Sequence, residues 1–385
     1  MFILSNFSSQ KPRYQIEQGL ALEWLTQAHA SAQATIENLS PTEREVFAAR
    51  MGKLVQRCAC GPDKIATRGH VSADLGCLDF ENNALYDVVR HPRGRGTAAR
   101  AQLYSEVVNR YFVEEYQDER VAPSELIHVT CTGYVAPSGA QRLVAEKGWG
   151  ATTQVSHAYH MGCYAAFPAI RLAVGHLSSP AAFVPEGTSR RADIVHTELC
   201  TLHLDPSDHS AEQCVVQSLF ADGFVRYSLG RVEQPASCFE LLALSERVLP
   251  DSAESMSWSA GDFGMHMSLA RNVPELIAAD LETFVSRLVE KAGFTLRDVL
   301  AHAVLAVHPG GPKIIEGVQS TLKLSDTQVQ ASKDVLREHG NLSSATLPHV
   351  WLRILADPVV RPGTIVVSLA FGPGLTVCGG VFRKW

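Results

Sequence analysis

Three residues far apart in this 385-residue chain have side chains that together could carry out acyl transfer: Cys163, His308 and Asn341. A cysteine is a nucleophile only as its thiolate, which a nearby cation or a helix N-terminus stabilises. The small, apolar run over residues 163–175 predicts a buried helix that begins at the sulfur. His308 ends a strand-like stretch over residues 303–307, so its imidazole could hold the thiolate as an ion pair. The Asn341 amide could donate to an oxygen that becomes an oxyanion, which completes the requirements of acyl-transfer chemistry.

The motifs around these residues resemble those of one enzyme family. GCYAA surrounds the cysteine, HPGGPK begins at the histidine, GNLSSAT contains the asparagine, and AFGPGLTV lies near the C-terminus. In this order and spacing they resemble the type III polyketide synthases, the chalcone and stilbene synthase-like members of the thiolase superfamily. The resemblance runs from about residue 129 to the end and implies a Cys-His-Asn triad at Cys163, His308 and Asn341. HPGG replaces the HQAN-type motif of initiating β-ketoacyl synthases, which favours the polyketide branch.

Each triad residue also has a structural interpretation. Cys163 could be a buried structural thiol, which is the commonest role of cysteine, and His308 could be a core histidine with satisfied hydrogen bonds. Asn341 could belong to a helix C-cap, because Gly and Asn are both favoured there. The three separate motifs together favour the catalytic interpretation.

Two clusters of possible zinc ligands point less clearly to a site. One has the pattern H-x2-H-x2-C and ends at Cys163, and the other contains His196, Cys200, His203 and Asp205. If the second cluster lies in a strand, His196 and Cys200 share a face while His203 points away. Neither cluster contains paired CxxC motifs, so we predict no metal site.

Composition excludes several classes of protein. Hydrophobic residues make up 46% of the chain and charged residues 19%, which is typical of a globular protein with a large core. No apolar run approaches the roughly 20 residues that span a bilayer, and MFILSN is a poor signal peptide, so we expect a cytoplasmic protein. Nine cysteines without repeated spacing indicate reduced thiols. A net charge of −6 argues against a nucleic-acid binder.

The hydrophobic pattern predicts helices alternating with strands in both halves of the chain. In the first half we expect helices over residues 14–51, the second of them capped by Ser40, then a strand before Gly133, a helix over 138–146 and a strand over 195–204. In the second half we expect a helix over 273–293, a strand ending at His308, a helix over 326–338 and a closing strand over 364–374. This alternation predicts an α/β fold with a mixed sheet covered on both faces.

The resemblance implies more about the fold: a thiolase-like duplicated αβαβα layered architecture. The nucleophilic cysteine would lie in an N-terminal half, residues 1–234, and the histidine and asparagine in a C-terminal half, residues 235–385.

The resemblance also implies a substrate pocket beside the triad. Its gatekeeping positions would hold His203 or Leu204, and Met267, where the family has aromatic residues. This loss of aromatic bulk predicts a roomier, apolar pocket suited to aliphatic chains. The complete predicted lining is Cys131, Thr132, Gly133, His203, Leu204, Met267, Gly372 and Pro373.

A basic cluster lies earlier in the chain, in KLVQRCACGPDKIATRG: Lys53, Arg57, Lys64 and Arg68. It is either a solvated helix face or a docking site for the phosphates of coenzyme A or of a carrier protein's phosphopantetheine arm.

The implied activity is a Claisen condensation of acyl thioesters through an acyl group held on Cys163. The resemblance implies coenzyme A or carrier-protein thioesters as substrates, no further cofactor and a homodimer. The product would be an α-pyrone or a resorcinol. Within the family, the chain could instead join two carrier-bound β-ketoacyl chains into an α-pyrone. A Cys-dependent thioester hydrolase and a catalytically silent scaffold are the alternatives from other functional classes.

Overall fold

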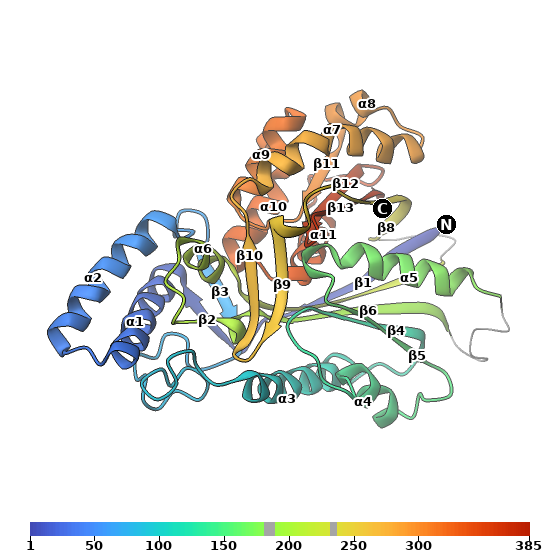
Figure 1. Ribbon diagram of the computed structural model, residues 1–385. Coiled ribbons are helices and arrows are strands. Elements are labelled where there is room, and N and C mark those ends of the chain that lie inside the picture. The colour runs from blue at the N-terminus through green and yellow to red at the C-terminus, as the bar shows by residue number, and fades with distance from the viewer. Residues whose placement is uncertain (181–188, 232–236) are drawn as a thin grey trace.

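The computed structural model describes residues 1–180, 189–231 and 237–385, and its central feature is a mixed β-sheet (Figure 1). Its nine strands run in the order β11-β12-β13-β8-β1-β7-β6-β4-β5. The pairs between β12 and β6 are antiparallel, whereas β11-β12, β6-β4 and β4-β5 are parallel. The strands are β1 (Phe2–Gln10), β4 (Pro123–Thr130), β5 (Gln154–Tyr159), β6 (Ser189–Leu199), β7 (Asp222–Gly230), β8 (Phe239–Val248), β11 (Val304–Val307), β12 (Ile365–Gly372) and β13 (Thr376–Lys384).

Two small sheets and the helices complete the described fold. Strands β2 (Tyr14–Glu17) and β3 (Thr67–His70) form one pair, and β9 (Met256–Gly261) and β10 (Gly264–Leu269) form a hairpin. The α-helices are α1 (Gln18–Glu37), α2 (Pro41–Cys58), α3 (Thr97–Glu115), α4 (Gly139–Glu146), α5 (Ala166–Ser178), α6 (Ala211–Leu219), α7 (Val273–Lys291), α8 (Leu296–His302), α9 (Pro312–Leu322), α10 (Asp326–His339) and α11 (Thr346–Ala356). No helix in the described ranges is long and apolar enough to cross a membrane.

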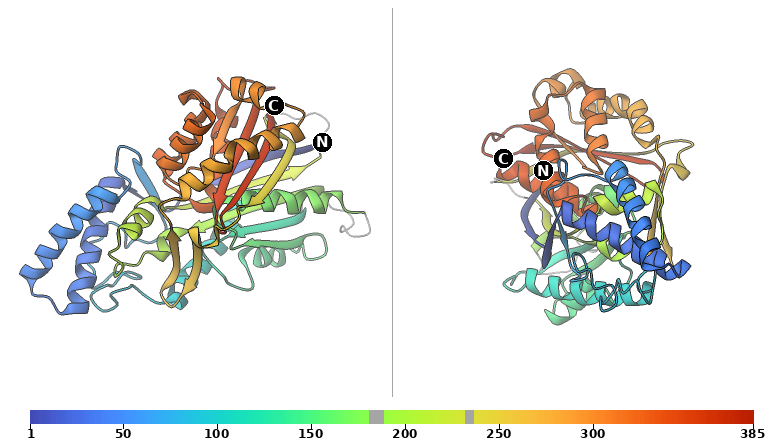
Figure 2. Two further views of the ribbon diagram at one scale, coloured as in Figure 1. Left: turned by 45° about the horizontal axis from the view of Figure 1, so that its top comes forward. Right: turned by 90° about the vertical axis from the view of Figure 1, so that its left-hand side faces the viewer.

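The hydrophobic core has three main parts, which arrange the helices and the sheet in five layers. Helices α5 and α11 share the middle part with β4 and β7 from one half and with β12 and β13 from the other. Phe167 of α5 and Trp351 of α11 meet there with ring centroids 6.0 Å apart. Helices α3 and α4 pack on the opposite face of the first half, and α7, α9 and α10 on that of the second (Figures 1 and 2). The observed order of layers is therefore helix, one half of the nine-stranded sheet, helix, the other half of that sheet, helix.

Several predicted helices begin or end at the expected local signals, but the helical stretch predicted over residues 14–51 is wrong at both ends: Tyr14–Glu17 is strand β2, and α2 continues to Cys58. Ser40 caps α2 through a capping box with Glu43, as predicted. Ser138 forms a capping box with Gln141 at the start of α4, and Ser325 forms one with Gln328 at the start of α10. Helix α10 ends at the predicted Gly340, whose φ of 74° favours glycine. These side chain to backbone contacts are local, which is why sequence reasoning found them.

The strands are where the sequence predictions are wrong. The strand predicted over residues 195–204 ends at Leu199, and a 3-10 turn, Cys200–His203, follows it. The face argument that separated His203 from Cys200 therefore does not apply. The predicted closing strand is followed by another, β13, which lies between β12 and β8. Strands β1, β7 and β8 and the hairpin β9-β10 were not predicted.

Each half of the chain places one of the predicted site residues directly after a strand. Cys131 follows directly after β4, and His308 follows directly after β11. Strand β1 joins the halves, because it pairs with β7 on one side and with β8 on the other. The boundary expected between residues 234 and 235 lies outside the described residues.

Candidate active site

Cys163 lies in the turn between β5 and α5. The residues around it form a 3-10 turn, Gly162–Tyr164, and α5 begins at Ala166, so the helix start predicted at the sulfur is three residues too early. Gly162 has a φ of 71°, and a Cβ there would come within 2.7 Å of Pro373 Cδ. Glycine is needed at this position because the loop of Pro373 packs directly on the turn. The cysteine is 7% exposed.

The Asn341 side chain has a fixed orientation beside Cys163. Its Oδ1 accepts the backbone N–H of Ser343 at 2.9 Å and the hydroxyl of Thr346 at 3.2 Å. The Nδ2 group must therefore point the other way, where it donates to Gly310 O at 3.2 Å and to the Cys163 sulfur. Asn341 thus links the cysteine to the HPGG loop of His308, with its amide donors facing the nucleophile.

His308 is buried and has no hydrogen-bond partner for its ring. Its backbone N–H donates to Leu369 O at 2.8 Å, which continues the pairing of β11 with β12. The residue is only 1% exposed, and neither Nδ1 nor Nε2 meets a donor or acceptor in the described ranges. Buried polar groups normally have partners, so an unpaired imidazole of this kind is typical of a site that acts on a ligand.

The pKa values of the pair describe a neutral resting state. Burial raises the pKa of the Cys163 thiol to about 12, although hydrogen bonds with Ser343 and Asn341 lower it. Burial lowers the pKa of His308 to about 3. Both shifts favour a neutral Cys163 thiol and a neutral His308 imidazole before substrate binds. A proton has to move from the sulfur to the imidazole when the acyl donor arrives.

A buried carboxyl, Glu198, lies behind the nucleophile. It accepts the backbone N–H of Cys131 at 3.1 Å and the hydroxyl of Thr132 at 2.8 Å, and Ser344 also donates to it. Cys131 Sγ lies 3.6 Å from Glu198 Oε2 and 3.0 Å from Ser343 Oγ, which is 4.0 Å from Cys163 Sγ. Burial and the Glu198 charge both raise the pKa of Cys131 well above its ordinary value. Cys131 is thus a hydrogen-bonding thiol and a poor nucleophile.

A narrow cavity opens at Cys163. Its volume is only about 10 Å³. Of the predicted pocket residues, the lining includes Cys131, Thr132, Met267 and Pro373. It also includes five residues that the prediction missed: Gly162, Cys200, Phe220, Trp258 and Ser343. The expected loss of aromatic bulk is therefore wrong, because Phe220 and Trp258 both occupy the wall. The SLFADG segment offered no local signal that Phe220 would face the nucleophile.

Four predicted pocket residues do not line this cavity. Gly133 lies against the ring of Tyr104, and Gly372 against that of Tyr164. The Leu204 backbone carbonyl accepts from Arg100 at 3.2 Å. Each of these residues shapes the surroundings of the cavity rather than its wall.

His203, the fourth of them, is a clamp between two elements. Its Nε2 donates to Thr132 O at 2.7 Å, and its Nδ1 accepts the backbone N–H of Met265 at 3.0 Å. Burial lowers the pKa of His203 to about 3, so the neutral ring can serve one partner as a donor and the other as an acceptor. His203 thereby fixes β10 against the segment that follows β4.

The basic cluster separates into exposed and buried members. Lys53, Arg57 and Lys64 are exposed, and Lys64 forms a 3.4 Å ion pair with Glu316 of α9. Arg68 is buried: it donates to Gln18 Oε1, Gln217 O and Phe220 O, each at 2.8 Å. The prediction that Arg68 belongs to a docking surface is wrong, because its guanidinium is used inside the protein.

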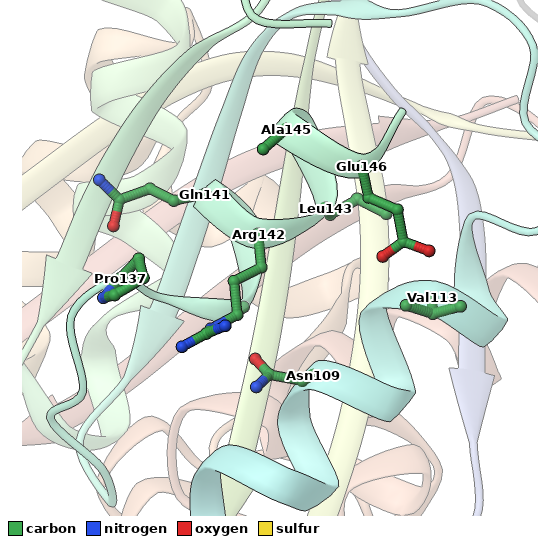
Figure 3. Close-up of a pocket in the computed structure, with 9 residues that line it drawn as sticks. Asn109, Val113, Pro137, Gln141, Arg142, Leu143, Ala145 and Glu146 are labelled. Carbon is green, nitrogen blue, oxygen red and sulfur yellow. The ribbon is translucent and has the colours of Figure 1, made fainter. Parts of the chain in front are cut away.

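The structure supports no chemical role for the two clusters of possible zinc ligands or for the hollow between α3 and α4. Within the described ranges, no group of three His, Cys, Asp or Glu side chains is arranged to hold a metal ion. His157 Nε2 lies 2.9 Å from Ser138 Oγ, and His196 Nδ1 lies 3.0 Å from Ser344 Oγ. A larger hollow, with a volume of about 550 Å³, lies between α3 and α4, where Asn109 and Arg142 face one another (Figure 3). Its lining contains no cysteine or histidine, so it offers no acyl acceptor.

Comparison with known sequences relates this arrangement to a family. Residues 240–384 match the sequence profile described as "Chalcone and stilbene synthases, C-terminal domain". Over 261 residues the chain is 28% identical to "Probable polyketide synthase 1" of Dictyostelium discoideum, and this alignment covers 66% of this chain and 8% of that protein. Over 268 residues it is 27% identical to "Type III polyketide synthase C" of Arabidopsis thaliana, covering 68% of this chain and 67% of the relative.

A solved structure extends the comparison to the whole chain. The C-terminal type III polyketide synthase domain of Steely1, a type I/III hybrid from Dictyostelium, superposes with a TM-score of 0.79 at 21% identity. The match covers 100% of this chain and 99% of that chain. At this identity the likeness establishes the fold, and it confirms the predicted α/β thiolase-like architecture.

Proposed function

We propose that the chain is a type III polyketide synthase of the chalcone and stilbene synthase kind, an acyltransferase that condenses acyl thioesters into a polyketide. The sequence profile matched by residues 240–384, the relatives of 27–28% identity and the shared fold support this proposal. The observation that carries this proposal is the arrangement at Cys163. The buried Cys163 thiol lies in the wall of a narrow cavity, the oriented Asn341 amide contacts that sulfur and the HPGG loop, and His308 at the start of that loop has an imidazole without a partner. Thioester chemistry needs these three groups: a nucleophile, an acceptor for its proton and a donor for the oxyanion.

In the proposed first half-reaction, Cys163 takes the acyl group from its thioester. The Cys163 proton passes to His308, the thiolate attacks the thioester carbonyl, and the free thiol of coenzyme A or of a carrier protein leaves with the proton. The neutral resting pair supports this order, because both the donor and the acceptor of the proton are then in the required form.

In the proposed second half-reaction, a malonyl thioester loses carbon dioxide and becomes an enolate. His308 Nε2–H and Asn341 Nδ2–H donate to the enolate oxygen, and the enolate carbon attacks the acyl carbonyl on Cys163. The bond between that carbonyl carbon and Cys163 Sγ breaks, and the released thiolate takes a proton from solvent to restore the thiol. An oxyanion donor of this kind contributes about 2.7–4 kcal/mol to the transition state. The fixed amide supports this role, since its oxygen is already occupied and only its N–H groups face the site.

The proposed product is an α-pyrone or a resorcinol. Lactonisation of the finished chain gives the α-pyrone and keeps every carbon, whereas aldol closure to a resorcinol releases the terminal carboxyl as carbon dioxide. Joining two carrier-bound β-ketoacyl chains would also give an α-pyrone. Mass spectrometry of the product distinguishes these routes by the number of carbons retained.

We also propose that the exposed members of the basic cluster guide thioester entry and that the enzyme acts as a homodimer. Lys64 supports the first proposal, because its ion pair with Glu316 joins the end of the α2 segment to α9, the helix that follows the HPGG loop. The dimer rests on the family resemblance alone, and sedimentation of the purified protein tests it.

Acylation of a single cysteine tests the proposed function. After incubation with a medium-chain acyl-coenzyme A, intact-mass spectrometry should detect one adduct, and peptide mapping should assign it to Cys163. Cys131→Ser and Cys200→Ser change cysteines that line the same cavity and serve as matched controls. In both variants the adduct should still form on Cys163. An adduct that persists in Cys163→Ala would exclude the assignment. Release of free acid without carbon–carbon bond formation in the presence of malonyl-coenzyme A would identify a hydrolase instead.

A further inference from the structure

Five polar side chains form a continuous chain of hydrogen bonds that the proposed reaction does not yet use. The Tyr159 hydroxyl lies 2.8 Å from His128 Nδ1, and His128 Nε2 lies 2.8 Å from Thr197 Oγ1. Thr197 Oγ1 in turn lies 3.0 Å from the Tyr104 hydroxyl, which also hydrogen-bonds Thr130. These residues come from β4, β5, β6 and α3, which pack together (Figure 1). We name the five residues the His128 chain.

The inner end of the His128 chain reaches the buried carboxyl behind the nucleophile. Thr130 donates to Glu198 Oε2 at 3.4 Å. From this carboxyl, the contacts of Cys131 and Ser343 described above continue to Cys163 Sγ. A connected polar route therefore ends at the reacting sulfur.

The outer end of the His128 chain is open to solvent. Tyr159 is half-buried, whereas the other four residues are at most 3% exposed. A second branch from the carboxyl runs through Ser344 and His196 to the Tyr227 hydroxyl, which is fully buried. Of these two branches, only the His128 chain joins the carboxyl to the surface.

The hydrogens of the His128 chain can all point inward. Thr130 gives its own hydrogen to the carboxyl, so its bond with Tyr104 uses the tyrosine hydrogen. Tyr104 then accepts from Thr197, and Thr197 accepts from His128 Nε2–H. Burial lowers the pKa of His128 to about 3, so Nδ1 of the neutral ring is free to accept from Tyr159. Each group thus accepts one hydrogen and donates another, which is what proton relay requires.

The proposed condensation needs a proton at Cys163. It consumes one proton for each carbon dioxide released, because the sulfur leaves the acyl carbonyl as a thiolate. Cys163 is 7% exposed, and the cavity beside it has a volume of only about 10 Å³. A cavity this small is filled by the substrate, so the proton has to reach the sulfur through the protein.

We propose that the His128 chain conducts this proton from solvent through Glu198 to the Cys163 sulfur. The inference rests on the proposed function and adds the route of its proton. Solvent protonates the outer tyrosine while the tyrosine hydrogen moves to His128, and each later group passes one hydrogen inward. The Ser343 hydrogen bonds to the sulfur as the bond from the sulfur to the carbonyl carbon breaks. Tautomer exchange at the ring and rotation of the hydroxyls then reset the chain, whose members are positioning residues because none touches the substrate.

A matched pair of tyrosine variants tests the route. Tyr159→Phe removes the outer hydroxyl and keeps the ring, so condensation with malonyl-coenzyme A should slow on the order of 10-fold or more, within the contribution of positioned proton transfer. Acylation of Cys163 by hexanoyl-coenzyme A should keep its rate, because the departing thiol takes the proton of Cys163 itself. The control is Tyr134→Phe, whose hydroxyl bonds to His160 outside the chain, and it should leave both rates unchanged. Rapid-quench measurement separates the two steps.

Two results with the tyrosine variants would overturn the inference. One is the same condensation rate in Tyr159→Phe and Tyr134→Phe. The other is an equal slowing of acylation and condensation in Tyr159→Phe, which would indicate a structural role. Tyr159 is half-buried, so this comparison also decides the question if a variant of the buried His128 fails to fold.

His128→Gln separates proton transfer from hydrogen bonding. Its amide can donate to Thr197 as the imidazole does, but it cannot pass a proton from one end of the side chain to the other. Condensation should slow as in Tyr159→Phe. In mixtures of H2O and D2O, the wild-type condensation rate should follow a curve against the deuterium fraction, since several protons move together, whereas the variant should give a straight line.

The remaining outcomes distinguish the inference from the proposed function. A straight line for the wild type, or a wild-type condensation rate in His128→Gln, would reject the proton route alone. Absence of any acyl adduct on Cys163 in the wild type would reject the proposed function and the route with it.

Discussion

Asn341 contributes to the site through its Nδ2 group, because its Oδ1 already accepts two hydrogen bonds from within the protein. Ser343 N and Thr346 Oγ1 both donate to Oδ1, so the amide cannot rotate without losing both bonds. A substrate oxygen at this site therefore meets N–H donors. This polarity distinguishes a catalytic asparagine from the helix-cap interpretation, which the sequence left open.

Two substitutions separate the donor from the scaffold. Asn341→Asp keeps the oxygen that accepts both bonds and loses the donor, while Asn341→Ala loses both. Both variants should still acylate Cys163, and both should slow carbon–carbon bond formation by roughly 10²–10³, the effect of one oxyanion donor. Rapid-quench measurement of each half-reaction checks this. If acylation and condensation slow equally in Asn341→Asp, the residue is structural.

Arg68 shows how a charge run in sequence can conceal a buried residue. Burial lowers its pKa to about 10, so the guanidinium remains charged at neutral pH while it binds three acceptors. Arg68→Ala should lower the free energy of unfolding by about 3 kcal/mol or more, since each buried acceptor left unpaired costs about 1–3 kcal/mol. Lys53→Ala is the control and should stay within about 0.5 kcal/mol. Urea unfolding measures both, and equal stability of the two variants would contradict the structural role.

The sequence could single out Cys163, His308 and Asn341 as candidates, but not the role of Arg68. The triad residues stand in short motifs that can be read locally. Arg68 depends on Gln18, 50 positions earlier, and on carbonyls about 150 positions later. No local pattern carries such contacts, and the same limit applies to Phe220.

At the scale of elements, the hairpin β9-β10 forms one wall of the cavity. Trp258 and Met267 are direct partners across the hairpin, and both line the cavity. Trp258 Nε1 donates to Cys131 O at 2.6 Å, and Gln213 Nε2 donates to Met267 O at 2.8 Å. With the His203 clamp, these bonds hold the hairpin against the half of the chain that carries the nucleophile.

The hairpin should set the acyl chain length that the enzyme accepts. Trp258→Ala removes the indole from a cavity that is already narrow, so kcat/KM for long acyl chains should rise relative to short ones by roughly 10-fold, the scale of specificity in an apolar pocket. Trp258→Phe keeps most of the bulk and loses only the bond to Cys131. A series of acyl-coenzyme A substrates from 4 to about 12 carbons measures the preference. Equal shifts in both variants would assign the effect to the bond rather than to the bulk.

The elements that sequence reasoning missed have weak local signals. Strand β13 contains Gly379 and Gly380, which dilute a strand pattern. The structure explains the first of them, because a Cβ on Gly379 would lie 2.6 Å from Leu288 Cδ2 of α7. Capped helices, by contrast, carry their signals within four residues of each end. Helix bounds were therefore predictable here, and strand order was not, because it depends on which distant strands meet.

At the scale of the whole molecule, burial has made many histidines neutral. Burial is the main cause that lowers the pKa to about 3 or 4 in the following histidines: His29, His128, His196, His203, His308, His339 and His349. In an unfolded chain each would titrate near 6.5. Between these values the unfolded state binds more protons than the folded state, so acid favours unfolding.

The free energy of unfolding should therefore decrease as the pH falls below about 6.5, with each such histidine contributing up to about 1.4 kcal/mol per pH unit. Asp222, whose pKa burial raises to about 7, and Glu198, raised in the same way, act in the opposite direction, but they are fewer than the histidines. Urea midpoints at pH 7.5, 6.5, 5.5 and about 4.5 measure the slope. A midpoint that stays constant or rises toward acid would contradict this prediction.

The position of β1 constrains the order in which the protein can be built. Leu4 pairs with Leu229, and Phe2 pairs with Leu241, so the first strand has both its neighbours more than 200 residues later. During synthesis on the ribosome this strand emerges before β7 and β8 and remains without these partners until both have been translated. Its buried Ile3 and Leu4 are exposed to solvent or to a chaperone during that interval. The two halves of the sheet thus meet at a strand that is translated more than 200 residues before its partners, and a delay in translation after residue 10 prolongs its risk of aggregation.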